Sequence, residues 1–266
     1  MDYLLVCTVA LIVAALTLVS GFGLGTLLMP AFAAFFPLEI AIAATAVVHL
    51  ANNLFKVALV GRWARGGVVL WFGLPAIAAA ILGARLMLSL AHIAPIARYE
   101  VAGIRGAIEP IKLVIAALIA LFAALELSPR FQRLSLSPAM LPVGGALSGF
   151  FGGLSGMQGA LRAAFLVRAG LSRDQFIGTA AVVSTLVDLA RLAVYIFGFA
   201  ALGRGTPWAG LREERMQLLI AAACLAAFAG SYFGARIVKK VTLRAIQRLV
   251  AVMLILFSAA LAAGLI

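Results

Sequence analysis

The chain has 266 residues, of which 65% are hydrophobic and only 11% are charged. An average soluble domain carries roughly 25% charged residues, so this composition excludes an ordinary water-soluble protein. The net charge of +12 comes from Lys and Arg spread among short connections, which favours membrane topology and lipid contacts over nucleic-acid binding.

Hydropathy and helix-breaking residues divide the chain into about eight apolar segments. Most of them approach the roughly 20 residues that a helix needs to cross a bilayer, and they lack the alternating polarity of a membrane β-barrel. In chain order the segments cover residues 3–30, 39–60, 67–90, 106–126, 139–166, 175–200, 216–235 and 245–265. The sequence therefore predicts an all-α, multi-pass integral membrane protein.

An internal repeat divides these segments into two sequence-related halves, a first membrane repeat of residues 1–134 and a second of residues 135–266. SGFGLGTLLMP at residues 20–30 aligns with SGMQGALRAAF at residues 155–165, at an offset of 135. Many transporters are built from such repeats. An even number of crossings in each half would make the repeats parallel, whereas re-entrant first segments would make them inverted.

The first segment of each repeat is broken near its middle by glycine and serine. In the first repeat the break contains Ser20, Gly21 and Gly23, and in the second it contains Gly152, Gly153, Ser155 and Gly156. One explanation is close helix packing through small-xxx-small spacing, as at Gly145, Gly149 and Gly153. The other is a broken helix whose free N–H groups and positive dipole end bind an anion.

A polar stripe interrupts the second segment of each repeat. At helical spacing the first repeat carries His49, Asn52, Asn53 and Lys56. At the repeat offset the second carries Ser184, Asp188 and Arg191. Ionisable groups cost about 2.5–3.5 kcal/mol at the centre of a membrane helix, so these side chains are expected to face the protein interior. Alternatively, Lys56 and Arg191 lie near helix ends and snorkel to the interface, and Asp188 merely pairs with Arg191.

Gln158 and Arg162 follow the second glycine break and are expected to line the same cavity. The candidate substrate-binding residues are therefore Ser20, Gly21, Gly23, His49, Asn52, Asn53, Lys56, Ser155, Gly156, Gln158, Arg162, Asp188 and Arg191. The chain shows no catalytic constellation and no metal-binding cluster, so we expect neither an enzyme nor a bound cofactor. The basic, hydroxyl and amide side chains suit an anion better than a cation.

At these residues the chain resembles the TauE/SafE family of membrane proteins, often called sulfite exporters. The resemblance rests on SGFGLG at residues 20–25, TAVVHLANNLFK at 45–56, SGMQGALRAAF at 155–165 and VVSTLVDLARLAVY at 182–195. It implies a secondary transporter that exports sulfite or an organosulfonate across the bacterial cytoplasmic membrane. Asp188 replaces the amide that internal symmetry would place there, so it either neutralises Arg191 or takes a proton.

Two other functions remain open at this point. Broken helices and basic residues would also suit an intramembrane enzyme that acts on a lipid phosphate, and the chain could instead be a non-transporting membrane subunit. As partners we expect a small anionic substrate and membrane lipids but no nucleic acid, and a homo-oligomer is compatible with the sequence.

Overall fold

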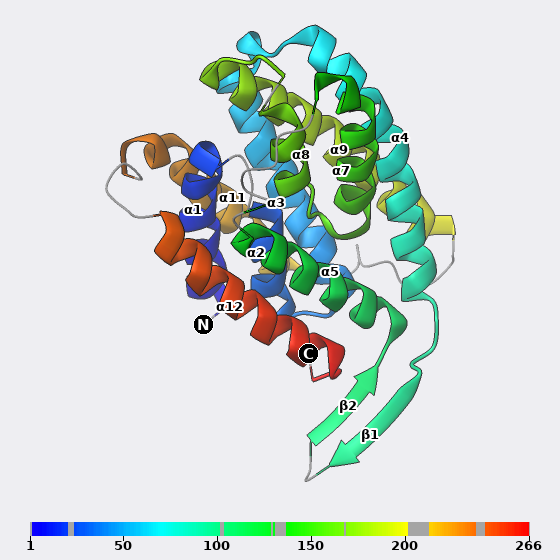
Figure 1. The fold of residues 1–266 in the computed structure, drawn as a ribbon. Helices are drawn as coiled ribbons and strands as arrows, with labels where there is room; N and C mark the ends of the chain where they lie inside the picture. Colours follow the sequence, from blue (N-terminus) through cyan, green and yellow to red (C-terminus); the bar gives the residue numbers. More distant parts are fainter. Residues whose placement is uncertain are drawn as a thin grey trace.

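A computed structural model describes residues 2–20, 24–101, 104–128, 130, 137–167, 169–201, 213–237 and 243–265. Helices dominate these residues, and one small β-hairpin projects from the helical body (Figure 1). The first half contains α1 (Asp2–Ser20), α2 (Leu24–Ala33), α3 (Leu38–Val60), the 3-10 turn η1 (Gly61–Trp63), α4 (Gly66–Ala91), β1 (Ala97–Val101), β2 (Ile104–Ile108) and α5 (Pro110–Leu127). The second contains the 3-10 turn η2 (Pro138–Met140), α7 (Leu141–Ser155), α8 (Gly159–Leu166), α9 (Arg173–Ala201), α11 (Glu214–Ile237) and α12 (Leu243–Ala262).

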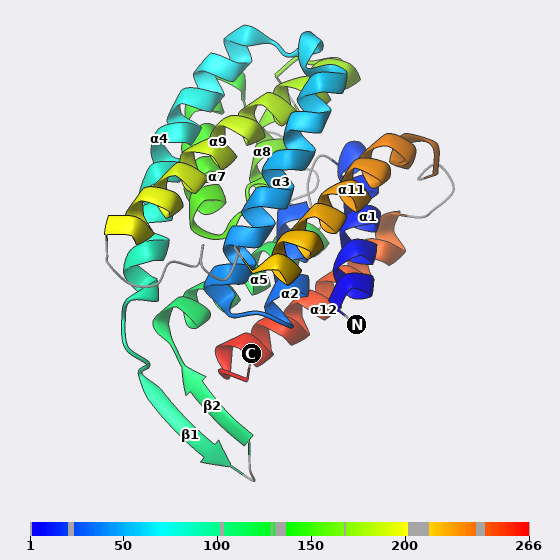
Figure 2. The ribbon, with the colours of Figure 1, turned by 180° about the vertical axis from the view of Figure 1, so that it is seen from behind.

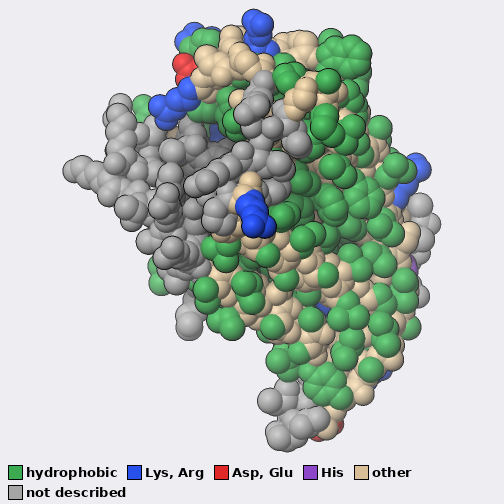
Figure 3. All heavy atoms as spheres, in the orientation of Figure 1, with side chains coloured by type: hydrophobic (Ala, Val, Ile, Leu, Met, Phe, Trp, Pro, Cys, Tyr) green, Lys and Arg blue, Asp and Glu red, His purple; other side chains and the backbone are tan. Residues whose placement is uncertain are grey.

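The length and apolar surface of the helices confirm an all-α membrane protein. Within the described residues, four stretches are long and apolar enough to cross a membrane: Leu38–Trp63, Gly66–Ala91, Arg173–Gly198 and Glu214–Phe233. Shorter apolar helical stretches cover Asp2–Ala15, Pro110–Leu125 and Ala251–Ala262. Hydrophobic side chains cover most of the face seen in Figure 3, and several of its Lys and Arg side chains gather at one end. Eight complete crossings are not confirmed.

The β-hairpin was not predicted from the sequence. Residues 106–108 were placed at the start of a helical segment, but they belong to β2, and α5 begins only at Pro110. Proline is favoured in the first turn of a helix because its missing N–H is not needed there. The two strands pair antiparallel, and the Tyr99 hydroxyl donates a 2.6 Å hydrogen bond to the Ala263 carbonyl. The hairpin is thereby joined to the C-terminal end of the chain.

Glycines bring α4 and α7 into backbone contact. A Cβ atom on Gly145, Gly149 or Gly153 would lie 2.0 Å from a carbonyl oxygen of α4, at Phe72, Ala76 and Ala80 respectively. Each glycine therefore lies where any side chain would clash. The small-xxx-small explanation is correct for these three glycines.

The second glycine-broken segment folds back on itself. The helix α7 ends at Ser155, Gly156 adopts a left-handed conformation with φ of +82°, and α8 begins at Gly159. The far end of α8 returns along α7, because a Cβ on Gly144 would lie 2.2 Å from the Phe165 ring. Residues 139–166 thus form a helical hairpin, which fits the alternative of a re-entrant first segment that the sequence left open. In the first half of the chain, α1 also packs against α2.

The long helices α3 and α9 lie side by side in opposite directions (Figure 2). The start of α9 meets the end of α3, since a Cβ on Gly178 would lie 2.5 Å from the Val60 carbonyl oxygen. Further along both helices, His49 of α3 meets Asp188 of α9. One apolar core joins α1, α2, α3, α5, α11 and α12 with parts of α4, α7, α8 and α9, and a second joins other parts of α4, α7, α8 and α9.

Candidate functional site

The carboxylate of Asp188 lies at the centre of a buried polar cluster. Its Oδ2 atom accepts a 2.8 Å hydrogen bond from the Asn53 amide and lies 2.7 Å from Nδ1 of His49. The Asn53 amide nitrogen is also 3.0 Å from His49 Nδ1. Because a carboxylate oxygen only accepts, the 2.7 Å contact with Asp188 assigns the ring proton of His49 to Nδ1, and the 3.0 Å contact between the Asn53 nitrogen and Nδ1 is then not a hydrogen bond.

Arg191 holds the other oxygen of the same carboxylate. Its Nε atom donates to Oδ1 of Asp188 at 3.0 Å, and Nη2 lies 2.9 Å from that oxygen. Nη2 and Oδ1 are close enough to form an ion pair, but they are not aligned as a hydrogen bond requires. Nη2 therefore has no hydrogen-bond partner among the described residues. Arg191 is fully buried in the middle of α9, so the snorkelling alternative is wrong for this residue.

The reversal between α7 and α8 adds two more polar side chains. Gln158 donates through Nε2 to Oδ1 of Asp188 at 3.4 Å, and Arg162 donates to the hydroxyl of Ser184. The turn is positioned by Ser148, whose hydroxyl donates a 3.0 Å hydrogen bond to the Gln158 carbonyl. The first turn of α8 also leaves backbone N–H groups without acceptors inside the helix. This arrangement brings the second glycine break against α9.

Gly156 is required in that turn for two reasons. Its φ of +82° is a conformation that side chains disfavour, and a Cβ atom there would lie 2.7 Å from Nη1 of Arg191. Arg191 is therefore packed directly against the turn.

Lys56 lies one turn beyond Asn53 on α3 and is only 9% exposed, so it does not snorkel into solvent. Its charge interacts with that of Arg162. Seven of these side chains form one set, which we call the buried polar cluster: His49, Asn53, Lys56, Gln158, Arg162, Asp188 and Arg191. The cluster contains three basic side chains and one carboxylate, so its basic groups outnumber its acidic groups by two when His49 is left out of the count.

Asn52 faces a different neighbour from the rest of its stripe. Its Oδ1 atom accepts a 2.8 Å hydrogen bond from Ser231 of α11, while its Nδ2 atom is buried without a hydrogen-bond partner among the described residues. The hydroxyl of Thr45, which lies one turn before His49 on α3, is also buried and has no hydrogen-bond partner among the described residues. Two hydrogen-bond donors of α3 are therefore unused.

The remaining predicted site residues fall into two groups. Ser155 is buried at the end of α7, but its hydroxyl donates to the Phe151 carbonyl of the same helix at 3.0 Å, so the structure does not bring it to Asp188. Gly21 and Gly23, and the side chain of Ser20, lie outside the described residues.

Three polar side chains near the cluster were missed in the sequence. Tyr195 donates a 2.5 Å hydrogen bond to the Gly153 carbonyl, and it extends the stripe of Arg191 by four residues, a spacing that could have revealed it. Thr45 precedes His49 by the same spacing. Ser231 carried no local signal, because its partner Asn52 is 179 residues away.

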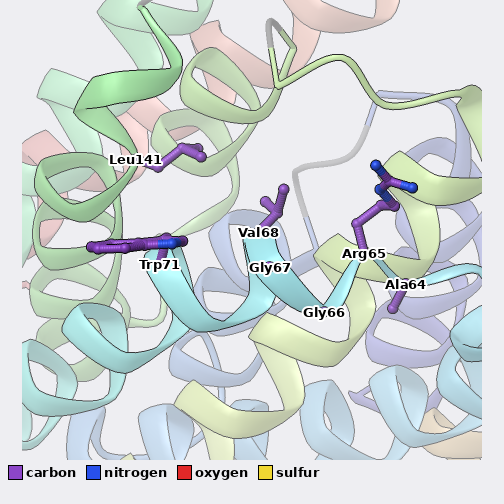
Figure 4. Close-up of a pocket in the computed structure, with 7 residues that line it drawn as sticks. All are labelled: Ala64, Arg65, Gly66, Gly67, Val68, Trp71 and Leu141. Carbon is purple, nitrogen blue, oxygen red and sulfur yellow. The ribbon is translucent and has the colours of Figure 1, made fainter.

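A pocket of about 540 Å³ lies elsewhere, at the start of α4. Figure 4 shows its lining residues, among them Arg65, Trp71 and Leu141. Neither this pocket nor the one of about 650 Å³ beside the β-hairpin includes a residue of the buried polar cluster. These pockets are open surface features, whereas the polar side chains predicted to bind substrate lie between the helices.

The fold and the cluster define a polytopic helical membrane protein with charged and amide side chains in its interior. The chain matches the family described as Sulfite exporter TauE/SafE over residues 6–261, which is nearly its whole length. It belongs to this family, whose members are membrane transporters and not enzymes. Neither a curated protein nor a solved structure matches the chain.

Proposed function

We propose that this transporter exports a small sulfur-containing anion, of the sulfite or organosulfonate class, across the bacterial cytoplasmic membrane. The observation that carries the proposal is the excess of two basic side chains over acidic ones in the buried polar cluster. Burying ionisable groups within a membrane protein is costly, and such groups commonly mark the path of a substrate. Family membership supports the sulfur-containing class.

The donors in and beside the cluster suit an oxyanion. Arg162 and Lys56 supply charge, while the Asn52 amide and the Thr45 hydroxyl supply hydrogen bonds that the described residues leave unused. Charge-assisted hydrogen bonds of this kind are stronger than neutral ones. An inside-negative potential favours outward movement of an anion by about 2.3 kcal/mol per charge per 100 mV, which supports export.

We further infer that the two halves, residues 1–134 and 135–266, are inverted repeats. The equivalent helices α3 and α9 pack antiparallel, whereas an axis along the membrane normal would make equivalent helices parallel. The hairpin of α7 and α8 supports the same inference, because a re-entrant pair reverses the direction of the helices that follow it. Inverted repeats commonly place the substrate site at their interface.

The test is efflux of radiolabelled sulfite, thiosulfate, isethionate and sulfate from proteoliposomes with an imposed membrane potential. We expect saturable efflux of at least one sulfur-containing anion, and loss of most of it in Lys56→Ala and Arg162→Ala. Lys112→Ala and Arg85→Ala are matched controls, because Lys112 pairs with Glu109 at 3.5 Å and Arg85 is exposed. Folded protein that moves none of these anions would contradict the proposal and favour a non-transporting subunit.

A further inference from the structure

One carboxylate receives most of the donors of the buried polar cluster. Asp188 is approached by His49 Nδ1 at 2.7 Å, Asn53 Nδ2 at 2.8 Å and Arg191 Nε at 3.0 Å. Gln158 Nε2 adds a longer contact at 3.4 Å. These donors come from α3, from the turn before α8 and from α9, so Asp188 links these three parts of the structure. A transported oxyanion would need donors of the same kind.

The environment of Asp188 is otherwise positive. The charged and titratable groups that interact with it are Arg162 of α8, and Arg191 and Tyr195 of α9, in addition to His49, while Lys56 of α3 interacts with Arg162. The helices α2, α4, α7 and α11, which pack against α3 or α9, add no buried ionisable side chain among those that the structure describes. Asp188 is therefore the single carboxylate among the described side chains of the cluster.

His49 can take a proton without leaving Asp188. With the Nδ1 proton directed to the carboxylate, Nε2 is the ring nitrogen that accepts a further proton. A proton on Nε2, or on the carboxylate itself, raises the charge of the His49–Asp188 pair by one. The two groups share this proton as a coupled unit.

We propose that Asp188 competes with the transported anion: its carboxylate holds the donors of Asn53, Gln158 and Arg191, and it yields them to the anion as the His49–Asp188 pair takes up one proton. This inference rests on the proposed function. The proton comes from water and joins Nε2 of His49 or the Asp188 carboxylate, and no bond between heavy atoms forms or breaks. The protonated pair no longer cancels a positive charge of the cluster, so the anion replaces the charge that Asp188 supplied.

Proton uptake and anion binding then strengthen each other, because linkage is reciprocal. Anion affinity is greatest at pH values below the titration of the pair and falls as the pH rises through it, by at most about tenfold per pH unit for one proton. Wild-type protein should therefore bind anion more tightly in acid.

The test measures binding of isethionate to the purified full-length protein by calorimetry between about pH 5 and about pH 8. Isethionate is chosen because a sulfonate keeps a single negative charge over this range, so any pH dependence belongs to the protein. Repeating the titration in buffers with different heats of protonation counts the protons taken up. We expect close to one proton per anion near the titration of the pair.

Variants separate the pair from the other titratable groups. Asp188→Asn should bind isethionate at least as tightly as wild type at high pH and lose most of the pH dependence, and His49→Gln should also flatten it. Lys56→Arg should keep it, because the arginine is permanently charged but the pair is intact. Should Asp188→Asn not fold, His49→Gln and the wild-type proton count still decide the matter.

Three results would overturn the inference. Binding without proton uptake would show that Asp188 keeps its charge and does not yield to the anion, while leaving the transporter proposal intact. A pH dependence that survives His49→Gln but disappears in Lys56→Arg would assign the proton to Lys56. No binding of isethionate at any pH would contradict both this inference and the sulfonate class of the proposed function.

Discussion

Asn53 and Asp188 are joined by a 2.8 Å hydrogen bond although 135 residues separate them. The same separation is the offset that aligns residues 20–30 with residues 155–165. Two equivalent residues can touch each other only near the axis that relates their repeats. We infer that this hydrogen bond marks the axis and that the functional site is built around it, where α3 and α9 cross.

The first prediction concerns the buried ion pair of Asp188 and Arg191. Arg191→Met should destabilise the protein by about 3–5 kcal/mol, because it leaves the carboxylate without its guanidinium partner in a buried site. The double variant Asp188→Asn with Arg191→Met should be less destabilised than the sum of its single variants, by roughly 0.5–3 kcal/mol. Reversible unfolding in mixed detergent micelles measures these free energies. Additive effects would show that the two side chains do not stabilise each other.

Much of the fold could be predicted because hydrophobic length and helix breakers act locally. The boundaries of α3, α4, α9 and α11 agree with the predicted segments to within two residues, and the stripe of His49, Asn53 and Lys56 follows from helical spacing. The reversal after α7 could not be predicted, because a glycine break fits a kinked crossing as well as a hairpin. The contact of Gly144 with Phe165 decides between them.

For a similar reason, only part of the candidate site could be predicted from the sequence. Spacing places side chains on one face of a helix, but it does not say which face of which neighbour they meet. His49 and Asp188, or Asn52 and Ser231, come together only through the packing of α3 against α9 and α11. Residues that lie 139 or 179 positions apart form no local sequence pattern from which their contact could be predicted.

A second prediction tests the close contact of α4 and α7. Gly149→Ala should destabilise the protein by about 1–3 kcal/mol, because the new Cβ would lie 2.0 Å from the Ala76 carbonyl oxygen and must push the helices apart. Gly67→Ala is the matched control, since nothing lies within 4 Å of a Cβ at that position in the first turn of α4. Replacing a helical glycine with alanine there should be neutral or stabilising by up to about 1 kcal/mol. Equal midpoints of thermal unfolding for the two variants would contradict the packing argument.

The third prediction concerns Gly156, the glycine of the turn between α7 and α8. Gly156→Ala should reduce anion efflux strongly, because it combines about 1–2 kcal/mol of left-handed backbone strain with a clash against Nη1 of Arg191. Gly170→Ala introduces similar strain, with φ of +68°, but has nothing within 4 Å of the new Cβ. Both variants should lose stability, whereas only Gly156→Ala should lose transport per folded molecule. An equal loss of transport in both would mean that backbone strain, and not the position of Arg191, limits activity.

The fourth prediction concerns Ser231, which positions Asn52 from outside the predicted stripe. Ser231→Ala removes the 2.8 Å hydrogen bond to Asn52 Oδ1, so the amide that we propose donates to the anion loses its fixed orientation. A hydrogen bond of this kind contributes roughly 0.5–1.5 kcal/mol, which predicts that the KM for efflux rises between about twofold and tenfold with little change in the maximal rate. Ser231→Thr keeps the hydroxyl and should restore the KM. Ser258→Ala is the control, because the Ser258 hydroxyl donates only to the Ile255 carbonyl of its own helix, and it should leave the KM unchanged. A fall in the maximal rate without a change in KM would instead assign Ser231 to the movement of α11 against α3.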